Sequence, residues 1–247
     1  MNLRGWVSLM VMLALGTSGA AWSQNLPVVT ATPAGGGMVY AVPVQTLLTL
    51  TALTFLPAAL MLMTSFTRIL IVFSLLRQAL GLQSMPPNMV LIGLSLFLTA
   101  LVMNPVLTVM YNEAYLPLVA GNIGFEAAVE KASEPLRQFM LQQTRQEDLN
   151  TFAALYDKPI ATRADVPMSV LVPAFAISEI KTGFLAGFMI YLPFIAIDFA
   201  VASILTSLGM VMVSPMMFSL PLKLVIFALA DGWSLLAASL VSSYRLV

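Results

Sequence analysis

The residues of this sequence that could do chemistry are the few ionisable side chains inside long apolar segments. In chain order they are Glu179, Lys181, Asp198, Lys223 and Asp231. Asp198 has 16 uncharged residues before it and 24 after it. Because an ionised group at the centre of a bilayer costs a few kcal/mol, we expect each of these groups to find an opposite charge or water. The pattern therefore indicates a buried ion pair or a relay for protons or ions.

Asp198 and Lys223 are the candidates for a pair across a helical hairpin. Counted from the turn at Ser214-Pro215, Asp198 lies 16 residues before it and Lys223 lies eight residues after it. These depths do not match within one hairpin, so two arrangements stay open: an asymmetric hairpin, or a pair between neighbouring subunits. The alternative is that each side chain extends separately to the membrane surface. We favour pairing, which would fix the register of the helices more than it would stabilise them.

Several kinds of chemistry are excluded by what the sequence lacks. The chain has no His and no Cys, which rules out histidine acid–base catalysis, cysteine nucleophiles, thiolate metal sites and disulfides. An intramembrane aspartyl protease needs two carboxylates that share a proton, and no Gly-x-Gly-Asp signature occurs. No Gly-x-x-x-x-Gly-Lys phosphate-binding pattern occurs either. We therefore expect no enzymatic activity, no cofactor and no metal site.

The elements that position these residues follow from composition. Of 247 residues, 60% are hydrophobic and 9% are charged, which is too apolar for the surface of a soluble domain of this size. The 11 basic and 11 acidic residues balance, so no net charge attracts nucleic acid. We expect an all-α membrane protein whose apolar blocks are helices.

The order of segments predicts five regions. Residues 1–23 are typical of a cleavable secretory signal, and residues 24–43, with three prolines and three successive glycines, predict an irregular leader. Two apolar helical blocks follow at 44–112, and two more at 168–247. Residues 113–167 form a polar region, which signal cleavage would place outside the cytoplasm.

The polar region is expected to be helical. Apolar residues recur at helical spacing from Phe125 onward, and again around Phe139 after Pro135. Ser133-Glu134-Pro135 is typical of a helix start, and a third short helix should hold Phe152 and Leu155. Phe139 and Phe152 should pack in a small core or in a subunit contact.

A methionine cluster surrounds the turn between the last two blocks. Met210, Met212, Met216 and Met217 lie close together beside Ser214-Pro215. Methionine is a common filler of apolar cores, but its unbranched side chain can also repack around something that passes. A ring of such residues could block ions by excluding water.

Several long motifs of the sequence are specific enough to indicate a family. The clearest is PAFAISEIKTGF at residues 173–184. Others are MTSFTRI at 63–69, LLRQALG at 75–81, PPN at 86–88, LPLK at 220–223 and DGW at 231–233. With these motifs the sequence resembles the FliP family of flagellar type III export proteins, and the likeness covers nearly everything after about residue 40.

The resemblance implies a fold and a set of site residues. It implies helical hairpins that form an oligomeric pore rather than an ordinary four-span bundle, with a methionine-rich loop at the pore constriction. The loop matches Met210, Val211 and Met212, and Val211 stands where relatives can have another Met. The resemblance also implies a charged pair for Asp198 and Lys223, and assembly contacts for three further residues, Glu179, Phe139 and Phe152.

The resemblance further implies a function and partners. Members of the family are subunits of the channel for unfolded flagellar proteins, in the inner membrane at the flagellar basal body. Their partners are further copies of the same chain, FliQ and FliR, together with FlhB and FlhA. Two other functions stay open from the residues alone. A proton- or ion-coupled secondary transporter subunit would use Asp198, Lys223 and Glu179 as a relay, although the chain lacks inverted repeats. A purely structural scaffold would not depend on the pore residues.

Overall fold

The computed structural model describes residues 30–34, 37–41, 47, 50–51, 54–55, 57–58, 61–156, 160, 162–210 and 212–244. The chain divides into two compact units, Met1–Pro57 and Ala58–Val247. The segment predicted to be a signal, residues 1–23, lies outside the described residues. In the first unit, β1 (Thr30–Ala34) pairs antiparallel with β2 (Gly37–Ala41). The stretch 24–43, expected to be irregular, thus contains two paired strands.

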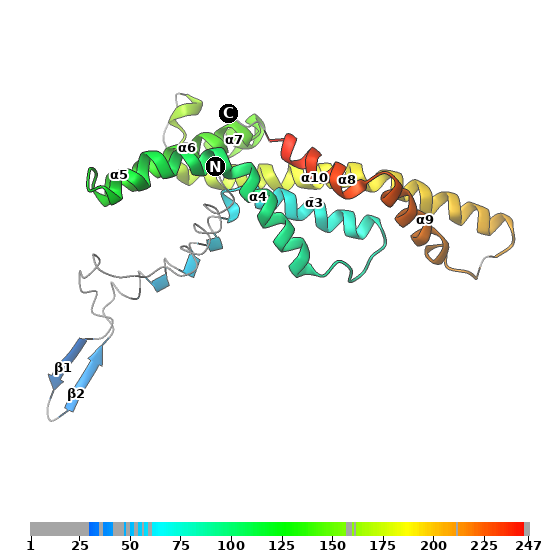
Figure 1. Ribbon diagram of the computed structural model, residues 1–247, viewed down its shortest axis with the longest axis horizontal. Helices are drawn as coiled ribbons and strands as arrows, with labels where there is room; N and C mark the ends of the chain where they lie inside the picture. The colour runs from blue at the N-terminus through cyan, green and yellow to red at the C-terminus, as the bar shows by residue number, and fades with distance from the viewer. Residues whose placement is uncertain are drawn as a thin grey trace. The chain divides into compact units, whose positions relative to one another are not determined.

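The second unit is helical where it is described, which confirms the all-α prediction for this part of the chain. Its elements, in order, are α3 (Phe66–Ala79), α4 (Asn88–Met110), the π-helix η1 (Tyr111–Tyr115), α5 (Leu116–Val119), α6 (Phe125–Gln143), α7 (Gln146–Ala153), the 3₁₀ helix η2 (Arg163–Asp165), α8 (Met168–Ser207), α9 (Met216–Leu229) and α10 (Gly232–Ser242). Figure 1 shows α4, η1 and α5 as one long run and α8 as the longest helix.

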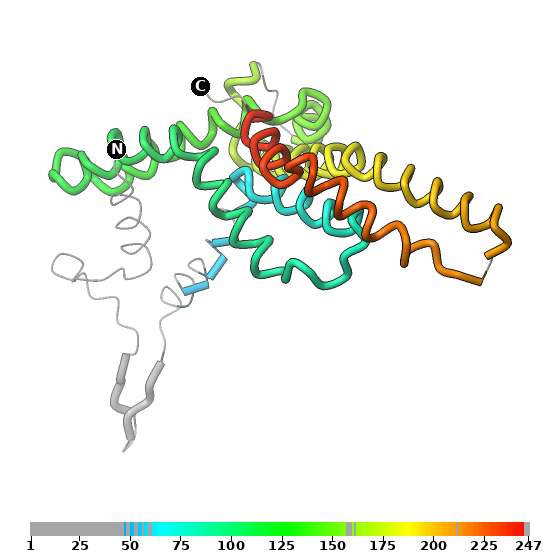
Figure 2. The backbone as a smooth tube through the Cα atoms, turned by 45° about the vertical axis from the view of Figure 1, so that its right-hand side comes forward, coloured from blue at the N-terminus to red at the C-terminus, as the bar shows by residue number. Residues whose placement is uncertain are grey.

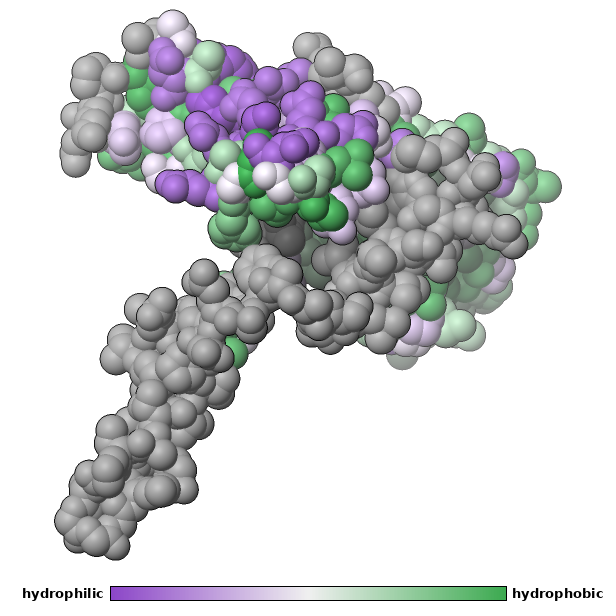
Figure 3. All heavy atoms as spheres, turned by 60° about the vertical axis from the view of Figure 1, so that its left-hand side comes forward, coloured by the Kyte–Doolittle hydropathy of each residue, from purple (hydrophilic) through white to green (hydrophobic). Residues whose placement is uncertain are grey.

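Among the described residues, two helical runs are long and apolar enough to cross a membrane. They are Asn88–Val119, which continues from α4 through η1 into α5, and Met168–Ser207, which is α8. The helices α9 and α10 reach that length only together, and they are bent by 63° at the break between them. The last apolar block is therefore a broken element, which returns along the second half of α8 in Figure 2. In Figure 3 hydrophilic residues gather where α6 and α7 lie.

One helix start in the polar region was predicted wrongly. The helix α6 runs without interruption through Pro135, and the Ser133 hydroxyl donates to the Glu130 carbonyl instead of capping a new helix. Proline removes one backbone hydrogen bond. The helix continues because α6 packs against α4, η1 and α8. The short helix expected farther on is α7, which holds Phe152 but ends before Leu155.

The most extensive contact between two described helices is that of α3 with α8, and two glycines of α8 allow it. A Cβ atom at Gly183 would lie 3.2 Å from Ile71, and one at Gly187 would lie 2.2 Å from Leu75 Cδ1. The missing side chains let the two backbones approach, as at small-residue contacts between membrane helices. This contact brings the charged residues of α8 next to those of α3.

We predict that Gly187→Ala destabilises the protein, because the new methyl group would overlap Leu75. Overpacking of this kind costs about 1–3 kcal/mol. The matched control is Gly93→Ala in α4, where a Cβ would meet nothing within 4 Å and where alanine favours the helix. Thermal unfolding of the purified protein in detergent measures both variants. Equal melting temperatures for the two variants would contradict the close packing of α3 on α8.

Candidate functional site

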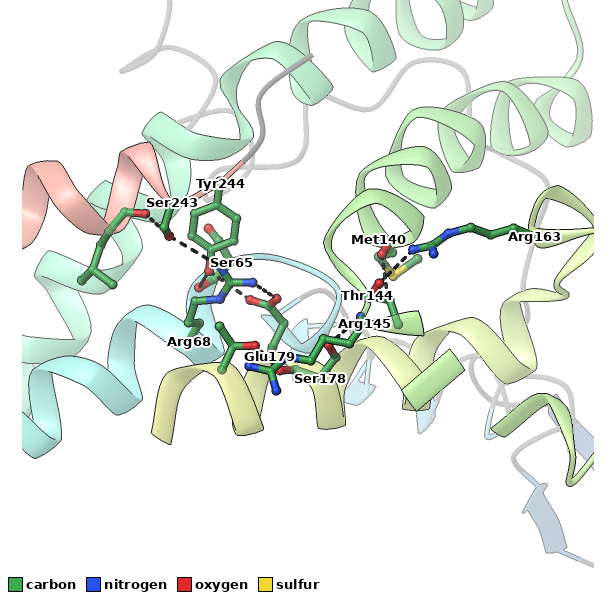
Figure 4. A network of polar contacts seen from close by, with 12 residues as sticks. Ser65, Arg68, Met140, Thr144, Arg145, Arg163, Ser178, Glu179, Ser243 and Tyr244 are labelled. Carbon is green, nitrogen blue, oxygen red and sulfur yellow. Dashed lines mark hydrogen bonds and ion pairs between the residues drawn. The ribbon is translucent and has the colours of Figure 1, made fainter. Parts of the chain in front are cut away.

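The first cluster of charged residues on α8 surrounds the carboxylate of Glu179, which is fully buried. Arg68 from α3 forms an ion pair with it. The Tyr244 hydroxyl lies 3.0 Å from Glu179 Oε2 and 3.2 Å from the Ser65 carbonyl oxygen, so it can donate to either acceptor. The Arg68 guanidinium also stacks 4.2 Å from the centre of the Tyr244 ring. Figure 4 shows these side chains converging from α3, α8 and the segment after α10.

This arrangement places the three expected assembly residues inside the chain. Glu179 is fully buried within the protomer, and Phe139 is buried with its ring 6.0 Å from Phe175 and 6.2 Å from Tyr244. Phe152 is partly buried against the same core. The contacts place these residues in the core of the protomer, and their role in assembly stays a prediction.

The polar region is attached to α8 just beside this cluster. The Arg145 backbone N–H donates to Ser178 Oγ at 2.9 Å, and Lys181 forms an ion pair with the buried Asp148 of α7. Sequence reasoning identified Lys181 but not its partner. It also missed Arg68, which the same rule for charges in apolar segments could have found, and Tyr244, which no sequence signal indicates.

Asp198 and Lys223 meet within one chain, across the hairpin of α8 and α9. Lys223 Nζ lies 2.6 Å from Asp198 Oδ2 and donates to the Ala79 carbonyl at the end of α3, 3.0 Å away. The Lys223 side chain is only 6% exposed, while that of Asp198 is 41% exposed. Of the two arrangements left open, the structure has the one within a subunit.

The depths of Asp198 and Lys223 in the hairpin seemed unequal because they were counted from the Ser214-Pro215 turn and not from the ends of the helices. The helix α8 ends at Ser207 and α9 begins at Met216, so residues 208–215 form a loop and not a tight turn. Measured from these helix ends, Asp198 lies nine residues before its end and Lys223 lies seven after its start. The two side chains therefore reach the same level of the hairpin.

The loop of residues 208–215 holds the predicted constriction residues. Gly209 stops α8 with φ +76°, while its N–H bonds to the Thr206 carbonyl and the Met210 N–H bonds to the Leu205 carbonyl. The Met210 side chain is 39% exposed and that of Met212 is 98% exposed. Val211 lies outside the described residues. The loop thus presents two thioethers away from the core of its own chain.

We predict that Glu179→Gln is more destabilising than Tyr244→Phe. The first change removes the counter-charge of a buried guanidinium, which costs about 3–5 kcal/mol. The second removes one hydroxyl and keeps the ring under Arg68, so about 1.5–3 kcal/mol is expected. Unfolding free energies in mixed micelles measure both, with the exposed Tyr115→Phe as a control that should be neutral. If Tyr244→Phe were the costlier change, Glu179 would not be the centre of the cluster.

We also predict that substitutions of Asp198 and of Lys223 lower the stability of the protein by unequal amounts. Asp198→Ala leaves the buried Lys223 ammonium with only the Ala79 carbonyl, so it should cost about 1–3 kcal/mol. Lys223→Met should cost less, because the half-exposed Asp198 can stay hydrated. Asp198→Lys alone should lower stability and secretion. Combining it with Lys223→Asp should recover only part of this loss, since an aspartate at 223 cannot donate a hydrogen bond to the Ala79 carbonyl. Secretion and unfolding midpoints test the series, and no recovery in the double variant would rule out the pairing.

The comparisons with known proteins agree on one family. A sequence model of the FliP family matches residues 49–240. The flagellar biosynthetic protein FliP of Pectobacterium carotovorum subsp. carotovorum is 54% identical over 226 residues, covering 91% of this chain and 88% of the relative. That of Bacillus subtilis is 50% identical, covering 81% of this chain and 91% of the relative. A relative from Buchnera aphidicola subsp. Baizongia pistaciae is 47% identical, and the match spans 61% of its length.

These names give no support to the secondary transporter that the charged residues alone had left open. The matched region contains the Arg68–Glu179 and Asp198–Lys223 ion pairs and the methionine loop, while Tyr244 lies just beyond its end. On this evidence the chain belongs to the FliP family.

Proposed function

We propose that this chain is a core subunit of the flagellar type III protein export gate. Several copies of it, together with FliQ and FliR, would form the channel through which unfolded flagellar proteins leave the cytoplasm. FlhB and FlhA would belong to the same apparatus. The site of this assembly would be the inner membrane at the flagellar basal body. Family membership supports this proposal, as do the relatives named flagellar biosynthetic proteins.

The observation that carries the proposal is the position of the methionine loop. Met210 and Met212 stand on the loop that joins α8 to α9, beyond the level at which Lys223 joins α9 to both α8 and α3. The base of the hairpin is therefore fixed, while the exposed thioethers remain free to repack. Flexible methionine side chains can part around a peptide and close again without exchanging hydrogen bonds.

The apolar surface of α8 also supports an assembly in a membrane. Phe184, Phe188 and Phe199 are exposed along this helix. A monomeric soluble protein does not expose a continuous apolar face of this kind, so lipid or another subunit would cover it. A channel built from several chains would cover part of it with protein.

Complementation tests the function directly. In a bacterium that lacks its own FliP, this chain should restore secretion of flagellar proteins into the medium, measured by immunoblot. Absence of secretion despite correct membrane insertion of the chain would contradict the proposal.

We predict that replacing Met210 and Met212 with Ala raises ion leak while the assembly stays intact. Smaller side chains would leave the constriction open to water and ions. Proton flux into membrane vesicles that contain the assembled complex measures the leak, which should rise several-fold. Met217→Ala, at an exposed methionine of α9 outside the loop, is the matched control. An unchanged leak would support a scaffold without a methionine seal.

A further inference from the structure

The turn between α3 and α4 lies against the first turn of α9. A Cβ atom at Gly81 would lie 3.6 Å from Met216 Cε and 3.8 Å from Leu220 Cδ1, so these two side chains cover the backbone at Gly81. Farther along α9, Lys223 donates to the Ala79 carbonyl at the end of α3. Met216, Leu220 and Lys223 are spaced by four and three residues, which places them on one face of the helix. This face of α9 therefore rests on the end of α3 and on the turn that follows it.

The α3–α4 turn, residues 80–87, is a firm support for this contact. Leu80 is buried in a core cluster that α3 shares with α8. Gly81 has φ +78°, and the next backbone N–H bonds to the Arg77 carbonyl, which closes the end of α3. At the other end of the turn, the Arg77 guanidinium donates to Asn88 Oδ1 at 2.6 Å. The turn is thus held at both of its ends.

The first turn of α9 is not fixed by the ion pair deeper in the hairpin, because a proline lies between them. Pro221 has no backbone N–H, so the helical hydrogen bond to the Met217 carbonyl is missing. Helices bend most readily at such positions. The contact of Lys223 with Asp198 therefore does not by itself set the position of residues 216–220.

The position of this first turn sets one end of the methionine loop, residues 208–215. The other end is set by Gly209, which stops α8. The Ser219 N–H bonds to the Pro215 carbonyl at 3.0 Å, so the end of the loop is continuous with the first turn of α9. Between the two ends, Met212 is 98% exposed, so side chains of its own chain hardly contact it. A shift of the first turn of α9 would therefore move Met212.

We propose that Met216 is a positioning residue for the constriction. Its side chain seats the first turn of α9 on the α3–α4 turn at Gly81, and thereby fixes where Met210 and Met212 stand. Met216 differs in this from the two loop methionines, because it acts through a contact within the chain and not by lining the pore. This proposal rests on the proposed function, which assigns Met210 and Met212 to the constriction.

The first test changes the support and leaves every methionine in place. Gly81→Asn introduces a residue that still adopts the left-handed conformation, but its side chain extends past the Cβ position toward Met216 and Leu220. Proton flux into vesicles that contain the assembled complex should rise several-fold. The matched control is Gly121→Asn, at a glycine with φ +73° where a Cβ would meet nothing within 4 Å, and it should leave the flux unchanged.

A double variant separates positioning from lining of the pore. Met216→Ala should raise the leak by a similar factor, whereas Met216→Leu, which keeps a long apolar side chain, should not. If both changes break the same contact, Gly81→Asn combined with Met216→Ala should leak no more than the leakier single variant. If Met216 itself lined the pore, the two factors would multiply in the double variant, and this result would overturn the proposal.

The contact itself can be measured without any export activity. In a chain without cysteine, Gly81→Cys and Met216→Cys supply the only two thiols. A short bifunctional maleimide should join them within one chain faster than it joins the pair of Gly81→Cys and Met217→Cys. The reason is that Met217 has no atom within 4 Å of a Cβ at Gly81.

Two further results would overturn the positioning role. The first is a leak from Gly81→Asn equal to that from Gly121→Asn, in complexes whose leak does rise when the loop methionines are replaced with Ala. The second is faster linking of Gly81→Cys to Met217→Cys than to Met216→Cys. If linking favours Met216→Cys but replacement of the loop methionines leaves the leak unchanged, the proposed function fails rather than the contact.

Discussion

The fixed position of α3 against α8 is the constraint on which the rest of the helical unit depends. At the start of α3, Arg68 and Glu179 pair beneath Tyr244, and at its end the Ala79 carbonyl receives Lys223, which also holds Asp198. Lys223 lies in the middle of α9 and Tyr244 follows α10, so the stretch of chain from Lys223 to Tyr244 runs antiparallel to α3 between two polar contacts. Between those contacts, Gly183 and Gly187 remove the side chains that would keep α3 and α8 apart.

This arrangement separates the residues that build the protomer from those it leaves for other molecules. Glu179, Phe139 and Lys223 are buried in contacts within the chain. The exposed set consists of Met212, Leu229 and three phenylalanines of α8, Phe184, Phe188 and Phe199. A buried group that loses its partner is costly, so changes at the first set act through the fold. We expect changes at the second set to leave the fold intact and to act on what passes or binds, which would make the two kinds of variant experimentally distinct.

The sequence predicted the helical membrane fold and the charges that matter, but not how those charges are paired. Composition was sufficient for the fold class, and the cost of charge in an apolar segment identified Asp198, Lys223 and Glu179. Their geometry depended on where α8 ends, which is set by the left-handed conformation of Gly209 and not by the Ser214-Pro215 turn. Glu179 meets Arg68 and Tyr244, which are 111 and 65 residues away, and no periodicity relates such distant positions. The packing of α6 likewise keeps it helical through Pro135, where the sequence had indicated the start of a new helix.

The most direct test of the central claim is a cryo-electron microscopy structure of this chain co-expressed with FliQ and FliR. The account predicts an assembly of several copies around a central constriction, with Met210 and Met212 facing the pore and the contacts of Glu179 and Lys223 unchanged within each protomer. A compact monomer with Asp198 and Lys223 lining a water-filled cavity would contradict it.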